Sequence, residues 1–329
     1  CPRPENVGLS SFGPRLTALI ALLIGGYRLS RRKTVSLLRD VLGIRISLGA
    51  VSHCEERVSD ALAFPVEEAD AYVRKQTVRH ADATGWRQAR LRKNLWVLAS
   101  TMVTVFQITA DGAKATVGKL LGKGRTGVLI SDRASVFLQW SLHRRQVCWA
   151  HLTRSFVAMS ERGGPSEEVG SILLTETRRM FELWHRFRDG PLTRTQFIAQ
   201  VAPTRRAILA TLKTGATCSH PRTAGTCANT LKLWPALWTF TRIDGVVPTN
   251  NHAEQELRHG VVWRKLSFGT QSQRGDDFVV RIMTTLATLR KQARSALDFL
   301  TAACVASNAG NAPPSLLPRR AHTDAASVR

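Results

Sequence analysis

Three acidic residues of this 329-residue chain stand where predicted elements begin or end, and carboxylates in such places can bind metal. Asp82 ends an alternating run that predicts a strand, Asp132 ends a second such run, and Glu254 lies near the start of a predicted helix. Three clustered carboxylates repel one another unless a divalent cation neutralises them, and hard oxygen ligands select Mg²⁺ or Mn²⁺. Each acid alone also has a purely structural explanation, because Asp is common at strand ends and in turns.

The helix that carries Glu254 is predicted to start at the capping residues 249–251 and to stop at Gly260 or Gly269. A capping box that includes Glu254, or an ion pair between Glu254 and Arg258, is the structural alternative to a catalytic role. Helical spacing places four residues on one face, which we expect to point inward: Glu254, Leu257, Arg258 and Val261.

The charge of the chain indicates a polyanionic partner. Lys and Arg number 47 against 24 Asp and Glu, a formal net charge of +23, and the excess is spread along the chain. A folded surface that binds nucleic acid explains this distribution better than a basic tail does. The longest apolar run, Leu16 to Ile24, is too short to span a membrane. The cysteines show no paired C-x-x-C spacing, so we expect reduced thiols and neither a zinc finger nor a disulfide framework.

Residues 15–70 are predicted to form short helices, two of which are joined by a glycine-containing turn as in a helix-turn-helix. The helix that starts near Ser47 is then the one that reads DNA, with Arg31, Arg32 and Lys33 as candidate phosphate contacts. Any small helical bundle shows the same pattern, so a structural role stays open.

From Gln76 the hydrophobic period changes to that of strands, and from His151 it returns to that of helices. A last helix is predicted from about Asp277 to Ala303, followed by a proline-rich end that we expect to be disordered. Between Gln76 and His151, the predicted elements are strands at 78–82, 95–99, 102–108, 127–132 and 145–147, with helices over 114–121 and 134–140.

The motifs that surround the three acids resemble, in order, those of the transposases of the insertion sequence 66 family. They are His80-Ala81-Asp82-x-Thr84-Gly85-Trp86, Ser131-Asp132-Arg133, Cys148-Trp149-Ala150-His151-Leu152, Thr249-Asn250-Asn251-His252-Ala253-Glu254 and Arg258-His259-Gly260, followed by Arg264 to Thr270. The resemblance covers residues from about 14 to 303. It implies an α/β (α+β) fold in which a ribonuclease H-like mixed sheet is flanked by helices, with an all-α insertion before the helix of Glu254.

The resemblance also implies a division of the chain. Family members usually carry an upstream coiled coil and a cysteine-rich zinc-binding segment; this sequence opens at Cys1 without an initiator Met, so we interpret its start as truncated. The expected parts are a remnant at 1–14, a helix-turn-helix-like DNA-binding segment at 15–70, the catalytic domain at 76–152 and 246–303, a helical insertion at 153–245 and a disordered tail at 304–329.

The activity implied is that of a DDE transposase, in which Asp82, Asp132 and Glu254 bind two Mg²⁺ or Mn²⁺ ions for DNA cleavage and strand transfer. The implied partners are the terminal inverted repeats of a mobile element, the target DNA and further copies of the chain, in a homodimer or higher oligomer. We expect a cytoplasmic, nucleoid-associated bacterial protein.

Other residues near the three acids are secondary candidates. Trp263 either stacks on an unpaired base or, as we favour, packs in the core. Cys148 and His151 have C-x-x-H spacing that could bind metal, but a buried thiol beside a structural histidine is the interpretation we favour. The candidates for phosphate contacts, unless they form only a solvated basic face, are Arg258, Arg264, Lys265 and Arg274.

Two alternatives share the charge and the helical N-terminal segment. One is a non-catalytic DNA-binding protein or a decayed transposase that binds element ends without cutting them. The other is a ribonuclease H-like nuclease or resolvase, which hydrolyses DNA without joining strands.

Overall fold

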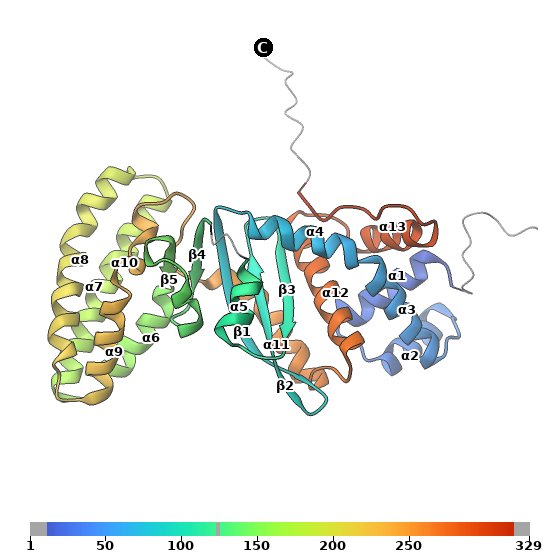
Figure 1. Cartoon of the computed structure of the whole chain (residues 1–329), viewed down its shortest axis with the longest axis horizontal. Helices are drawn as coiled ribbons and strands as arrows, with labels where there is room; N and C mark the ends of the chain where they lie inside the picture. Colours follow the sequence, from blue (N-terminus) through green and yellow to red (C-terminus); the bar gives the residue numbers. More distant parts are fainter. Residues whose placement is uncertain (1–11, 123–125, 319–329) are drawn as a thin grey trace, which may run out of the picture. The chain divides into compact units, whose positions relative to one another are not determined.

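The computed structural model describes residues 12–122 and 126–318, which contain thirteen α-helices and five strands (Figure 1). The chain divides into two compact units. Residues up to Gly124 and from His252 onward form the first, and Arg125–Asn251 form the second. Strands pair both antiparallel and parallel, so the mixed α/β class is confirmed and is consistent with a ribonuclease H-like fold.

The first unit begins with four helices whose ends follow from local sequence. The hydroxyls of Ser30 and Ser47 accept hydrogen bonds from the backbone amides of Lys33 and Ala50, and Gly43 ends the second helix at φ +67°. The short helices predicted here are therefore confirmed. They are α1 (Pro14–Gly25), α2 (Arg31–Leu42), α3 (Leu48–Ala61) and α4 (Ala63–Arg74).

A three-stranded antiparallel meander follows, in the order β3-β2-β1. Its strands are β1 (Val78–Gln88), β2 (Leu91–Ala99) and β3 (Thr104–Thr109), and α5 (Lys114–Leu121) comes next. The prediction that the first strand ends at Asp82 is wrong. Asp82 pairs with Val97 in the middle of the β1–β2 ladder, which continues without a bulge to the pair Gln88 and Leu91.

After the second unit the chain returns to the first unit with α11 (Asn251–Ser267), α12 (Gln273–Lys291) and α13 (Ala296–Asn308). Helix α12 covers the edge strand β3. The hydroxyls of Thr284 and Thr288 accept hydrogen bonds from the amides of Phe106 and Thr104 at 3.0 and 3.1 Å. Backbone groups that a sheet edge leaves unpaired are thus satisfied by threonines one helical turn apart.

The C-terminal predictions need correction. The single helix expected from Asp277 to Ala303 is two helices, α12 and α13. Helix α13 extends to Asn308, and the buried Leu316 accepts a 2.8 Å hydrogen bond from Gln292, so part of the segment expected to be disordered is packed. The remaining tail residues, 319–329, and residues 1–11 of the expected remnant lie outside the described residues.

The second unit joins a parallel strand pair to a helical array. Strands β4 (Val128–Ser131) and β5 (Arg145–Val147) confirm two predictions, whereas the helix expected over 134–140 is the 3-10 helix η1 (Ser135–Gln139). In its core Trp184 meets Phe197 and Phe240 edge to face, and these two phenylalanine rings are tilted against each other. The helices are α6 (Trp149–Ser160), α7 (Gly164–Arg188), α8 (Arg194–Ala216), α9 (Pro221–Lys232) and α10 (Trp234–Leu237), with short 3-10 turns η2 (Leu142–Arg144) and η3 (Thr239–Thr241).

Two global expectations can be compared with these residues. In residues 12–122 and 126–318, no helix is both long and apolar enough to cross a membrane. The cysteines in this part of the chain, Cys54, Cys148, Cys218, Cys227 and Cys304, are free thiols, as expected.

Candidate active site

Asp82 lies on the face of β1 that packs against α11. Because side chains alternate along a strand, His80, Asp82 and Thr84 share one face. The ring of His80 lies 4.9 Å from that of His252, and Arg264 Nη1 donates to Thr84 Oγ1 at 3.1 Å. These two contacts lie on either side of Asp82, so α11 runs along β1 past this carboxylate.

Gly260 fixes how closely α11 approaches the sheet. A Cβ atom at this position would lie 2.3 Å from Leu95 Cδ2 on β2 and 3.4 Å from Met283 Cε on α12. Of the two predicted helix stops, Gly260 is wrong, because the helix continues to Ser267, two residues before the alternative stop Gly269. The role of Gly260 is to let the backbone of α11 lie against β2.

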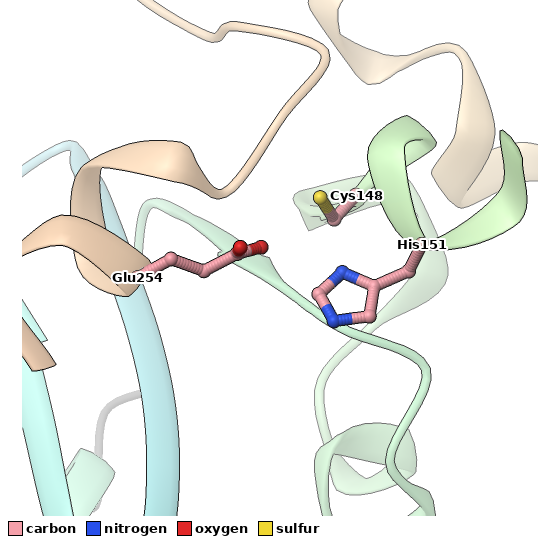
Figure 2. A group of neighbouring side chains, drawn as sticks. All are labelled: Cys148, His151 and Glu254. Atoms are coloured by element: carbon pink, nitrogen blue, oxygen red, sulfur yellow. The ribbon is translucent and has the colours of Figure 1, made fainter. Parts of the chain in front are cut away.

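Glu254 lies in the first turn of α11 and is partly exposed, and Figure 2 shows its side chain extending from the start of that helix. The inward face of α11 differs from the one predicted. Leu257 is buried as expected, but Arg258 is exposed, and the face is completed by Ala253, Gly260 and Trp263. Glu254 therefore stands at the border of the buried face.

A charged cluster that the sequence did not indicate supports the start of α11. Lys291 Nζ on α12 lies 2.6 Å from His252 Nε2, 2.8 Å from Ser100 O and 3.7 Å from Glu256 Oε1. Burial lowers the pKa of Lys291 to about 8, and burial together with the Lys291 charge lowers the pKa of His252. A neutral His252 can accept a hydrogen bond from the Lys291 ammonium group, which fixes its ring two residues before Glu254.

Asp132 follows β4 directly in the second unit, as predicted. Its carboxylate accepts a 2.9 Å hydrogen bond from the amide of Ala134, and its carbonyl accepts one at 2.6 Å from Arg145 Nη2. Arg145 is fully buried and also donates to Ser131 Oγ at 3.2 Å. Burial lowers the pKa of Arg145 to about 10, which leaves the guanidinium charged at neutral pH. The turn that carries Asp132 is thus held by an internal cation.

Cys148 is the N-cap residue of α6 in the second unit, and His151 lies in the first turn of that helix (Figure 2). Cys148 is fully buried, and its Sγ accepts a 3.1 Å hydrogen bond from the amide of Asn250. The amide of Trp149 donates to the carbonyl of Pro248 at 2.9 Å. These bonds fasten the segment before α11 to the start of α6, which supports the interpretation of Cys148 as a buried structural thiol.

The basic residues predicted to contact DNA fall into two groups. Arg31 Nε donates to Glu55 at 2.7 Å, and Arg274 Nη1 donates to Glu56 at 3.0 Å, so both are ion-paired with α3. Arg264 is held against β1. The others have exposed side chains on α2 or α11: Arg32, Lys33, Arg258 and Lys265.

Trp263 packs inside the first unit, as we favoured. Its exposed fraction is 8 %, its ring meets Phe278 edge to face with centroids 6.3 Å apart, and the Arg28 guanidinium lies 4.3 Å from its centroid. A side chain enclosed in this way is not available to stack on a base.

The sequence profile of a family described as "Transposase IS66 family" matches residues 10–277, which is most of the chain. No curated protein matches.

Proposed function

The chain belongs to the IS66 family of transposases, and on that premise we propose that it cleaves DNA at the 3′ ends of a mobile element and joins these ends to target DNA. A transposase family implies DNA as partner and divalent metal as cofactor. We infer that Asp82, Asp132 and Glu254 hold that metal, and that it is Mg²⁺ or Mn²⁺ in two positions.

One observation supports the proposal most. Asp82 stands between the two contacts that join β1 to α11, and Glu254 stands in the first turn of α11. Contacts on both sides of the two acids therefore hold α11 against β1. Carboxylate oxygens are the donors that Mg²⁺ and Mn²⁺ prefer, so this donor set fits the metal.

Bound divalent metal supplies an activated oxygen nucleophile and charge stabilisation at the leaving oxygen. Hydrolysis breaks the P–O3′ bond at each element end and leaves a free 3′-hydroxyl. In the joining step that hydroxyl forms a new P–O bond with a target phosphate, while the target's own 3′-oxygen leaves. Both steps proceed without a covalent protein intermediate. The exposed Lys265 and Arg258 follow Glu254 on α11 and provide cations for the DNA backbone. Joining two ends calls for two or more copies of the chain.

The test is cleavage and strand transfer on labelled DNA that carries the element's end, with the intact chain and Asp132→Asn compared in Mg²⁺ and in Mn²⁺. Loss of a metal ligand removes several kcal/mol of transition-state stabilisation, so we expect a loss of activity of roughly 1000-fold or more. DNA binding should persist, because the substitution removes a negative charge and no cation. EDTA should abolish cleavage in the same way.

Asp189→Asn is the matched control in the same unit. Asp189 is exposed and paired with its neighbour Arg188, an arrangement that contributes little to stability. Equal losses in Asp132→Asn and Asp189→Asn would contradict the assignment. If the intact chain binds DNA but cuts it with neither metal, the non-catalytic DNA-binding protein is the better description; cutting without joining indicates a nuclease.

A further inference from the structure

The loop between α11 and α12 presents an aromatic side chain to solvent. Phe268 is 78 % exposed, more than any other large apolar side chain among the described residues. Its neighbour Leu266 is 64 % exposed. A single exposed apolar side chain is common on protein surfaces, so what distinguishes Phe268 is the backbone and the charges around it. This feature is separate from Trp263, whose ring is enclosed.

The backbone around Phe268 is fixed rather than loose. Phe268 has φ +59°, a left-handed conformation that is uncommon for a bulky residue. Gly269 follows at φ +101°, and the amide of Thr270 donates to the carbonyl of Arg87 at 2.9 Å. The amide of Ala89 donates a 2.7 Å hydrogen bond to the carbonyl of Thr270. The loop is therefore clamped to the turn between β1 and β2, and Phe268 is held outward on a rigid support.

The start of α12 reinforces the clamp. Asp276 is buried and accepts hydrogen bonds from Trp86 Nε1 at 3.2 Å, Gln88 Nε2 at 3.0 Å and Lys93 Nζ at 2.8 Å, as well as from the hydroxyl of Thr270. One buried carboxylate thus ties the loop, the helix and both strands of the hairpin together.

The surroundings of Phe268 are basic. Segment 85–93 contains four Arg or Lys residues and segment 262–274 contains three, and neither segment contains an Asp or Glu. A groove of about 480 Å³ beside the hairpin is lined by Arg87, Arg92, Lys93 and Arg264. Lys93 is ion-paired with Asp276, as Arg274 is with Glu56, so the cations that this groove offers a ligand are Arg87, Arg92 and Arg264. Gly269, the residue after Phe268, lies against Arg87, which lines this groove. A strand of nucleic acid fits such an arrangement, because its phosphates can follow the cations while a base stacks on the ring.

We propose that Phe268 is a stacking platform for an unpaired DNA base, with the phosphates of the same strand in the groove of Arg87, Arg92 and Arg264. The inference rests on the proposed function, because a DNA end that is cut and joined presents unpaired bases to the enzyme. The inference adds to the three acids a residue that contacts DNA and takes no part in metal binding. The cations of the groove bind the strand whatever its sequence.

The test measures affinity in EDTA, so that it needs no cleavage. Two fluorescein-labelled probes are used, a short duplex and the same duplex with an internal run of unpaired thymines. The full chain should bind the unpaired probe more tightly than the duplex. Phe268→Ala should lose that preference, with roughly 5- to 100-fold weaker binding of the unpaired probe and little change for the duplex. Phe268→Tyr, which keeps an aromatic face, should retain the preference.

The matched control is Phe64→Ala. Phe64 on α4 is also an exposed phenylalanine, 60 % exposed, but Glu67 and Glu68 follow it, so it lacks the basic surroundings. The proposal is overturned if Phe268→Ala keeps the preference, if Phe64→Ala loses it equally, or if Phe268→Ala changes the oligomeric state instead. A chain that shows the predicted preference but never cuts DNA retains this inference and refutes the proposed function.

Discussion

Replacing Gly269 by alanine is expected to release the α11–α12 loop from the β1–β2 hairpin. Gly269 has φ +101°, and a Cβ atom there would lie 2.1 Å from the carbonyl oxygen of Arg87. Gly190 provides a matched position, because it has φ +102° and nothing within 4 Å of its Cβ. Alanine at either site incurs the left-handed backbone cost of roughly 1–2 kcal/mol, but only at Gly269 does it also meet another part of the backbone.

The additional destabilisation expected at Gly269 comes from the contacts that the new Cβ atom forces apart. Separating the new Cβ from the Arg87 oxygen requires the loop to shift by about 1 Å, which weakens its two backbone hydrogen bonds, each worth about 0.5–1.5 kcal/mol, and adds overpacking strain. We expect Gly269→Ala to destabilise the first unit by roughly 2–3 kcal/mol more than Gly190→Ala destabilises the second unit, in which Gly190 lies. For a unit of this size that difference lowers the melting temperature by about 4–12 °C.

Calorimetry gives the melting temperature of each variant, and amide hydrogen exchange reports the loop itself. Exchange of the amides of Ala89 and Thr270 should accelerate roughly 30-fold or more in Gly269→Ala and stay unchanged in Gly190→Ala. If the two variants melt alike, or if these amides keep their protection, the loop is not clamped in the way described and Phe268 lacks its rigid support.

Two further predictions concern buried cations. The pKa of Lys291, lowered to about 8 from 10.5 by burial, means that the folded chain binds fewer protons than the unfolded chain between these pH values, so unfolding free energy should rise with pH there. Relative to Lys291→Met, the intact chain should gain up to roughly 2 kcal/mol between pH 8 and 10 in urea titrations, and a flat difference would refute the buried charge. Arg145→Met should destabilise the second unit by roughly 2–3 kcal/mol, because it leaves the carbonyl of Asp132 without its buried donor. Calorimetry should show that loss in the second unit's transition alone, and an unchanged melting temperature would contradict it.

Local features of the fold could be predicted from sequence because their causes are local. The capping hydroxyl of Ser30 bonds an amide three residues away, and Gly43 ends the same helix. The length of β1 could not be predicted in this way. Gly85 suggested an end to the strand, but its pairing with Asn94 keeps it in the ladder, and that pairing depends on β2.

In the candidate site, too, features with local causes could be predicted, and features that depend on distant residues could not. Helical spacing identified Leu257 as inward-facing, but it could not tell whether Arg258 or Gly260 completes that face, since the choice depends on the close approach of Leu95. The contact between His252 and Lys291 joins residues that are 39 positions apart on different helices, so no local sequence pattern predicts it. The roles of Asp82, Asp132 and Glu254 came from their motifs, and they remain predictions that the cleavage assay tests.

The division of the chain has a consequence for synthesis on the ribosome. The second unit is continuous in sequence, whereas the first is built from residues before Arg125 and residues after Asn251. At about 5–20 residues per second, α11 and α12 emerge roughly 10–30 seconds after the meander that they cover. During that interval β3 has no threonines of α12 to satisfy its edge. The nascent meander is therefore an expected site for a chaperone to bind, and a stall within the second unit should promote aggregation through this exposed edge.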